Sequence, residues 1–297
     1  MFDTRAAICY NNPMGVRIKA FAKLNLTLAI TGLKDGYHML DSLVCTVDLF
    51  DLIKLKKRKD NLINVEMHGQ GTESLPPEDN NAVRAAEAYV SAFGTCGADI
   101  KIFKNIPVGA GMGGSSADAA GVLRGMAMLY GKGGERDLKK LADTLGSDTG
   151  YLLTGGFARL TDRGEMVEKL KVNGRLNFLL LLPDGGVSTA QCYKLYDGMS
   201  CGLLQCEPAL NALLTGDAQG LGKSLFNALY APAVKLCAGV ETAYSELSVF
   251  APLGVNMTGS GSGVYALFET AEMCAYAKSR YKGKCRCIEL KSYIPKI

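Results

Sequence analysis

The spacing of hydrophobic positions in the first hundred residues predicts several strands and one helix. The strands are expected at 16–30, 42–57 and 98–103, with a turn signal at 34–36. Residues 81–93 instead have helical spacing, with Asp79 or Asn80 as the cap and Gly94 as the stop. This part of the chain therefore combines a sheet with at least one helix.

The middle of the chain predicts two consecutive helices after a glycine-rich segment. One face of the first helix carries apolar residues at helical spacing: Ala119, Val122, Leu123, Met126 and Leu129. The second helix is expected at about 135–145, with Gly146 as its stop. Strands at 157–160, 176–182, 264–268 and 285–290 then alternate with helices around 189–197, 207–214 and 233–247. The pattern is mixed α+β, and we expect an N-terminal lobe at 1–158 and a C-terminal lobe at 159–297.

Composition excludes several classes of protein. The 297 residues are 48% hydrophobic and 21% charged, which is typical of a globular chain and not of a disordered one. The net charge of +4 is too small to indicate nucleic-acid binding, and the basic residues that alternate along 278–296 are typical of a solvated strand face. No apolar run approaches the roughly 18 residues of a membrane span, and no signal-peptide pattern opens the chain. We expect a cytoplasmic protein that binds neither nucleic acid nor membrane.

The ten cysteines do not form a recognisable disulfide or zinc pattern. They are scattered, with no C-x-x-C pair, and only His38 and His68 are available as histidine ligands. We expect reduced thiols that serve as small apolar residues.

The glycine-rich segment at 107–118 has the properties of a phosphate site. Four glycines in six residues let the backbone approach a ligand, and the helix that follows offers free N–H groups and its positive dipole end. A Walker loop is excluded because Ser115 stands where its lysine must be. The string G-x-G-x-x-G also suggests a nicotinamide dehydrogenase, but a helix follows where that fold needs a strand. A flexible turn with a serine cap is the plainest alternative.

This glycine-rich segment resembles a motif of the GHMP kinases. The segment from Pro107 to Ser116 is similar to that family's second motif, and six other segments follow the family's order and spacing. They are Ala22 to Leu26, Asp35 to Leu40, Glu78-Asp79-Asn80, Gly146-Ser147-Asp148 with Gly155 to Ala158, and Thr258 to Gly261. The first two are similar to the branch that phosphorylates the 2-hydroxyl of a cytidine diphosphate-linked methylerythritol in non-mevalonate isoprenoid biosynthesis.

The resemblance implies a two-lobed GHMP-kinase-like fold with the active site in the cleft between the lobes. It implies ATP and Mg²⁺ as cofactors, a small-molecule substrate, and a monomer or homodimer. Asp148 matches the catalytic base and Lys23 the lysine that favours its ionised form. The positions that match ATP-binding residues are Asn80, Lys104, Pro107, Gly109, Ala110, Gly111, Met112, Gly113, Gly114, Ser115 and Ser116. Those that match substrate-binding residues are Asn25, Tyr37, His38, Asp148 and Tyr193. No metal ligand set is assigned, although the hydroxyl of Ser115 or Ser116 suits Mg²⁺.

Two departures from the family pattern leave alternatives open. The family usually has three glycines before its two serines, whereas this chain has Gly113-Gly114-Ser115-Ser116-Ala117. After the aspartate the family usually has Val-Pro, whereas Thr149-Gly150 leaves Asp148 on a looser backbone. The alternatives are a GHMP kinase acting on mevalonate, homoserine or a sugar, and a catalytically silent ATP-binding homologue.

Overall fold

The computed structural model describes residues 15–69, 80–199 and 204–295. Glu78 and Asp79 of the expected motif, with Cys9 and Cys201, lie outside the described residues. The first half contains β1 (Val16–Asn25), β2 (Thr27–Lys34), β3 (Tyr37–Lys57), β4 (Asn64–His68), α1 (Asn81–Phe93), β5 (Ala98–Phe103), α2 (Gly114–Tyr130), α3 (Glu135–Asp143) and α4 (Thr149–Leu152). The second half contains β6 (Phe157–Asp162), β7 (Met166–Leu170), β8 (Asn177–Leu182), α5 (Thr189–Asp197), α6 (Glu207–Thr215), α7 (Ala218–Lys223), β9 (Phe226–Asn227), α8 (Tyr230–Leu236), α9 (Gly239–Ser248), β10 (Gly254–Met257), β11 (Val264–Phe268), α10 (Ala271–Arg280) and β12 (Arg286–Lys291).

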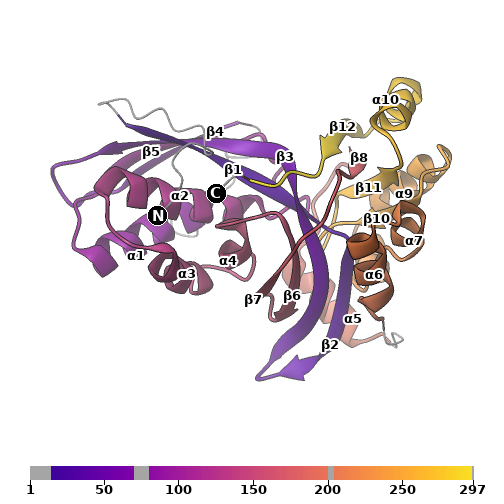
Figure 1. Cartoon of the computed structure of the whole chain (residues 1–297), viewed down its shortest axis with the longest axis horizontal. Coiled ribbons are helices and arrows are strands. Elements are labelled where there is room, and N and C mark those ends of the chain that lie inside the picture. The colour runs from indigo at the N-terminus through magenta and orange to yellow at the C-terminus, as the bar shows by residue number, and fades with distance from the viewer. Residues whose placement is uncertain (1–14, 70–79, 200–203, 296–297) are drawn as a thin grey trace.

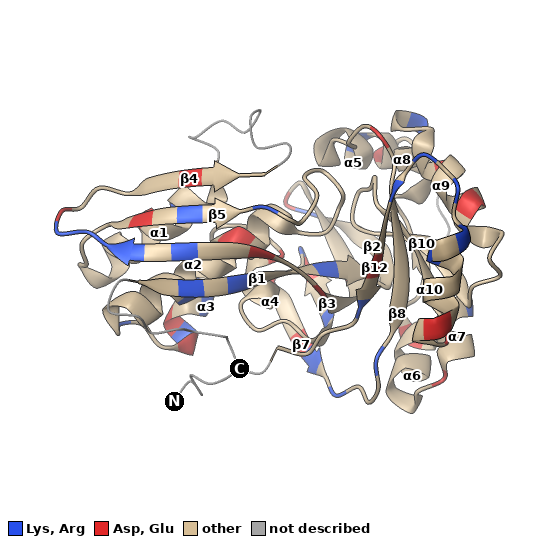
Figure 2. Cartoon of the chain, turned by 90° about the horizontal axis from the view of Figure 1, so that it is seen from above, with Lys and Arg blue, Asp and Glu red and all other residues tan. Residues whose placement is uncertain are grey.

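The 21-residue strand β3 is the spine of the larger sheet. Its C-terminal half pairs with β1 and β5, and β4 extends that edge. Its N-terminal half pairs with β2 and β6, so β3 runs from one end of the molecule to its middle. Strands β4, β5, β3 and β1 lie side by side, and helices α1 to α4 cover one face of this part of the sheet (Figures 1 and 2).

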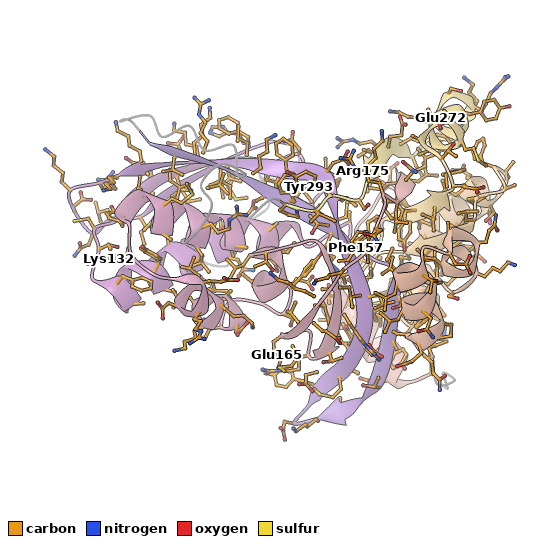
Figure 3. The ribbon with its side chains drawn as sticks, in the orientation of Figure 1. Lys132, Phe157, Glu165, Arg175, Glu272 and Tyr293 are labelled. Carbon is orange, nitrogen blue, oxygen red and sulfur yellow. The ribbon has the colours of Figure 1, made fainter. Side chains whose placement is uncertain are left out.

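A second, antiparallel sheet with the order β10–β11–β8–β12 lies at the opposite end of the molecule, packed against α9 and α10 (Figure 1). Two chain segments connect the two sheets. The short strand β9 pairs with β2, and the segment after β12 returns to the first sheet. There the backbone N–H of Tyr293 donates to the carbonyl of Thr46 at 2.8 Å, and its ring stacks on Phe21 with centroids 4.3 Å apart (Figure 3).

Helix α2 packs closely on the sheet because two residues on its sheet-facing side, Gly121 and Gly125, are glycines. A Cβ added at Gly121 would be 2.5 Å from the side chain of Ile53, and one at Gly125 would be 2.4 Å from that of Leu55. Buried apolar residues of α2, such as Ala117, Val122 and Met126, belong to the same core as Ile53 and Leu55. The close packing fixes the direction of α2, and so fixes where its N-terminus points.

Most expected elements are present, and the differences have local causes. The expected strand at 16–30 is broken at Leu26, because the N–H of Leu43, which would continue the ladder, donates instead to the hydroxyl of Thr27. The expected helix at 233–247 is two helices, α8 and α9, because Cys237 between them is extended. Six elements that were not expected are short: β4, β7, α4, α7, β9 and β10.

The structure also bears on the expectations for the cysteines, for membrane-spanning helices and for the division into two lobes. Every cysteine that the structure describes is a free thiol, as expected. Among the described helices, none has the length and apolar character needed to cross a bilayer. The expected division between residues 158 and 159 falls inside β6, which pairs with β3 and β7, and this division stays a prediction.

Candidate active site

Two adjoining cavities lie between the glycine-rich loop and the second half of the chain. The smaller, about 300 Å³, is lined by all eleven residues expected to bind ATP, from Asn80 and Lys104 to Ser116. The larger, about 710 Å³, is lined by Lys23 and by all five residues expected to bind substrate. Residues that line both cavities mark where they meet: Gly111, Gly113, Ser116 and Thr189. The two expected sets are thus adjacent, whereas their binding roles stay predictions.

The glycine-rich loop has a backbone that other residues adopt only with strain. Gly109, Gly111 and Gly113 have φ of 72°, 72° and 73°, in the left-handed region. A Cβ at Gly111 would also lie 2.0 Å from the carbonyl oxygen of Thr258. Gly113 is the N-cap of α2 and has no side chain to occupy the first N–H groups of that 17-residue helix. These groups and the helix dipole therefore serve the smaller cavity, as an anion site requires.

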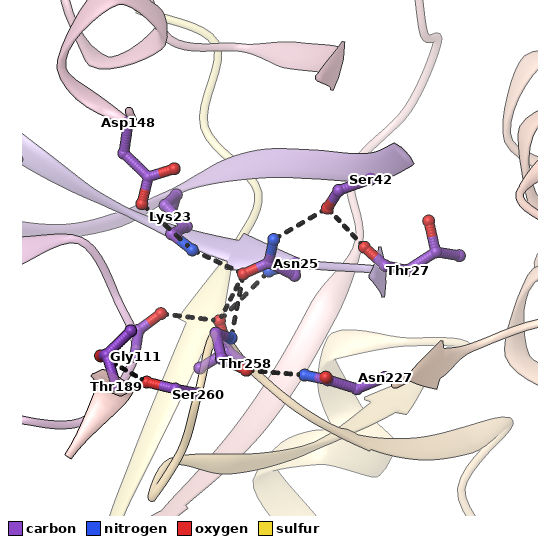
Figure 4. A network of polar contacts seen from close by, with 11 residues as sticks. Lys23, Asn25, Thr27, Ser42, Gly111, Asp148, Thr189, Asn227, Thr258 and Ser260 are labelled. Carbon is purple, nitrogen blue, oxygen red and sulfur yellow. Dashed lines mark hydrogen bonds and ion pairs between the residues drawn. The ribbon is translucent and has the colours of Figure 1, made fainter. Parts of the chain in front are cut away.

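Lys23 and Asp148 form an ion pair at the edge of the larger cavity. The Lys23 ammonium lies 3.4 Å from Oδ2 of Asp148 and donates to Oδ1 of Asn25 at 2.5 Å (Figure 4). Lys23 is 5% exposed, and its backbone N–H donates to the carbonyl of Met112 in the glycine-rich loop. Asp148 precedes the short helix α4 and is 27% exposed, so its carboxylate reaches the cavity. An accessible carboxylate beside a buried cation is suited to accepting a proton from a bound hydroxyl.

Asn25 positions this pair through a hydrogen-bond network that joins the N-terminal and C-terminal halves of the chain. Its Oδ1 also accepts from the N–H of Gly259 at 2.9 Å, and its Nδ2 donates to the hydroxyl of Ser42 at 2.8 Å (Figure 4). The Asn25 backbone N–H donates to the hydroxyl of Thr258, which in turn donates to the carbonyl of Gly111. Asn25 is therefore largely used in organising the site, with one amide N–H left for a ligand.

Lys104 sits between two buried carboxylates beside the smaller cavity. Its ammonium donates to Asp51 and, at 2.5 Å, to Oδ2 of Asp118. Asp51 also accepts from two backbone N–H groups, whereas Oδ1 of Asp118 is buried without a partner among the described residues. Burial raises the pKa of Asp118 to about 7. Burial alone would lower the pKa of Lys104, but the attraction of Asp118 and Asp51 raises it. An unpaired buried acceptor in a cavity wall suits a ligand hydroxyl or an ordered water.

Aromatic side chains gather at the far end of the larger cavity. The rings of His38 and Tyr193 lie with centroids 4.7 Å apart, and burial raises the pKa of Tyr193. Tyr37 is on the exposed β2–β3 hairpin, and the guanidinium of Arg163 lies 4.9 Å from its ring centroid. Nε2 of His38 lies 2.6 Å from Oδ1 of Asp197. Aromatic faces with polar groups at their edges are suited to a planar base.

Several residues that line the larger cavity or touch its lining were not predicted from the sequence. Thr189 lines both cavities and its hydroxyl lies 2.8 Å from that of Ser260. A signal existed for Thr189, because Ser188 before it has the character of a helix cap at the start of α5. Arg163 had no such signal, since a single arginine in a turn is typical of any surface loop.

Comparisons with known proteins agree with this geometry. The family models described as GHMP kinases N terminal domain and GHMP kinases C terminal match residues 80–158 and 209–278. The chain is 37% identical over 262 residues to a 4-diphosphocytidyl-2-C-methyl-D-erythritol kinase from Desulfitobacterium hafniense (strain Y51), covering 86% of this chain and 88% of the relative. It is 32% identical over 279 residues to the kinase of that name from Clostridium beijerinckii (strain ATCC 51743 / NCIMB 8052), covering 90% and 97%.

Solved structures show the same fold. The crystal structure of a 4-(cytidine 5'-diphospho)-2C-methyl-D-erythritol kinase matches with a TM-score of 0.77 at 28% identity, covering 93% of this chain and 99% of that one. A homoserine kinase from Cytophaga hutchinsonii matches with a TM-score of 0.66 at 18% identity, covering 93% and 96%, which is a likeness of fold alone.

Proposed function

The chain belongs to the GHMP kinases, in the branch of the 4-diphosphocytidyl-2-C-methyl-D-erythritol kinases, and on that basis we propose the reaction that its site performs. It transfers the γ-phosphate of ATP to the 2-hydroxyl of 4-diphosphocytidyl-2-C-methyl-D-erythritol, in the non-mevalonate isoprenoid pathway. Asp148 accepts the hydroxyl proton, and Lys23 holds Asp148 in place and stabilises negative charge on the transferring group.

The observation that carries this proposal is the junction of the two cavities. Residues at the start of α2 line both of them, and the Lys23–Asp148 pair lies on the side of the larger cavity. A triphosphate along the loop would end at this junction, next to an alcohol in the larger cavity. Phosphoryl transfer depends mainly on such positioning and on electrostatic stabilisation.

Magnesium fits the residues at this junction. Ser116 lines both cavities, whereas the nearby hydroxyl of Thr149 is buried behind them, lines neither, and has no partner among the described residues. A Cβ placed on Gly146 would lie 3.2 Å from the Thr149 hydroxyl and 3.5 Å from that of Ser116, so the two oxygens face the same small region. Mg²⁺ binds through one or two protein oxygens together with substrate phosphates and waters, and it would neutralise charge on those phosphates.

The substrate's cytidine diphosphate fits the aromatic end of the larger cavity. Tyr37, His38 and Tyr193 offer rings and a polar nitrogen for the base. Arg163 lines this cavity and supplies a cation for the diphosphate, which a guanidinium binds well. A cytoplasmic location and a monomer or homodimer are the expectations that accompany this function.

An ADP-release assay tests the proposal. Purified protein with Mg-ATP is expected to release ADP with the cytidyl substrate and not with mevalonate, homoserine or galactose. Release with one of those alcohols instead would keep the kinase fold and reject the cytosine role of Tyr37 and His38. ATP-dependent thermal stabilisation without release from any alcohol would indicate the silent homologue.

A further inference from the structure

One face of helix α5 runs along the larger cavity from its junction with the smaller one to its aromatic end. Thr189, Tyr193 and Asp197 are four residues apart, so they lie on one side of the helix, and about 12 Å of helix separates the first from the last. Thr189 lies at the junction and Tyr193 packs against the ring of His38. Asp197, at the last turn, contacts His38 directly.

The contact with Asp197 restricts what His38 can offer to a ligand. Nε2 of His38 lies 2.6 Å from Oδ1 of Asp197, and an ionised carboxylate only accepts hydrogen bonds. Nε2 must therefore carry the proton. In a neutral ring, Nδ1 is then an acceptor, and it makes no hydrogen bond with any residue that the structure describes.

The orientation of the ring is also fixed. The Tyr193 ring lies against it on α5, and the Tyr196 ring meets it edge-on with centroids 6.2 Å apart. His38 is only 17% exposed, while its partner Asp197 is 56% exposed. A ring held on two sides and bonded through Nε2 has only Nδ1 left for recognition.

We propose that Asp197 is a positioning residue that fixes the Nε2–H tautomer of His38, so that the site presents an acceptor and selects a base carrying an amino donor. Cytosine has an amino group at its fourth ring position, whereas uracil has a carbonyl oxygen there. Nδ1 of His38 can accept a hydrogen bond from the amino group of cytosine, whereas it repels the carbonyl oxygen of uracil. The proposal rests on the proposed function and assigns the origin of its preference for cytosine over uracil.

The chain has only two histidines, which makes the tautomer directly measurable. In protein labelled with ¹⁵N-histidine and carrying His68→Gln, the only histidine signals come from His38. At a pH high enough to leave the ring neutral, we expect a protonated Nε2 and an unprotonated Nδ1. Asp197→Asn, whose amide can either donate or accept, is expected to give a mixture of tautomers. A proton on Nδ1 rather than on Nε2 of the neutral ring in the His68→Gln protein, or an unchanged tautomer in Asp197→Asn, would overturn the proposal.

The kinetic arm compares the cytidyl substrate with its uridyl analogue. We expect the ratio of kcat/KM values to favour cytidine by at least about tenfold, and Asp197→Asn to reduce that ratio mainly through KM for the cytidyl substrate. The control is Glu168→Gln, an exposed carboxylate on β7 that lines neither cavity, which is expected to keep the ratio. A ratio unchanged in Asp197→Asn rejects the inference alone, whereas no turnover of the cytidyl substrate by the wild type rejects the proposed function.

Discussion

Replacing Asp148 with asparagine removes the proposed proton acceptor while keeping the size of the side chain. At the observed 3.4 Å, Coulomb's law with an effective dielectric constant of about 20 gives an attraction of about 5 kcal/mol between Asp148 and Lys23. Loss of a positioned general base typically lowers kcat by about 10²–10⁴-fold, or about 3–5 kcal/mol of activation barrier. The first magnitude describes how strongly Lys23 attracts Asp148 in the resting site, and the second predicts a large loss of kcat in Asp148→Asn.

The assay is a double-mutant cycle measured by ADP release. Lys23→Met is expected to lower kcat strongly in the wild type but much less in the Asp148→Asn background, because Lys23 acts partly through Asp148. Lys171→Met, which removes an exposed lysine, is the control. The thermal shift produced by ATP is expected to persist in Asp148→Asn, which separates the loss of chemistry from the loss of nucleotide binding.

Two results would refute this reasoning. Near wild-type turnover in a folded Asp148→Asn variant would exclude Asp148 as the base. Strictly additive losses of activation free energy in the double variant would show that Lys23 acts independently of Asp148.

Three further predictions concern the two cavities. Gly111→Ala places a Cβ 2.0 Å from a carbonyl oxygen at a left-handed position; we expect a lower Tm and a KM for ATP raised at least roughly tenfold, and an unchanged KM would contradict this. The pKa of Asp118 is raised to about 7, so the native state binds more protons than the unfolded state above about pH 4. Stability measured by denaturant should therefore fall as pH rises from about 4 to 7, and equal slopes in wild type and Asp118→Asn would contradict the assignment. Arg163→Gln should raise KM for the cytidyl substrate roughly tenfold with KM for ATP unchanged, and an equal effect of Arg175→Gln would exclude a specific role.

The sequence predicted the parts of the site that depend on local patterns. The glycine-rich loop, the start of α2 and the expected ATP-binding positions are contiguous or nearly so, and all of them line one cavity. Backbone conformation there is encoded by glycines a few residues apart, and a strong helix signal follows at once. The paired motif of Lys23 and Asn25 also lies on a strand that the alternation of residues indicates.

The parts that the sequence did not predict depend on contacts between distant segments. Asp118 looks like an ordinary polar residue within a helix, and only the fold brings it to Lys104 and Asp51. Asp197 is the last residue of α5, a position where a charged residue is usually solvated. Its contact with His38 joins positions 159 residues apart. Short elements such as α4 and β9 have too few residues to show a period, so only tertiary pairing defines them.

The turn at 258–261 contributes to the site through backbone packing as well as by lining the larger cavity. A Cβ at Gly259 would lie 2.7 Å from the carbonyl oxygen of Gly111, just as a Cβ at Gly111 would meet Thr258. The two turns therefore touch backbone to backbone, and Asn25 bonds to the second while Lys23 bonds to the first. Because Lys23 and Asn25 are on the same strand, the position of the ammonium beside Asp148 is set by both halves of the chain together. A change in the turn at 258–261, part of which lines the larger cavity, is thus also transmitted to the reacting groups through Asn25 and the glycine-rich loop.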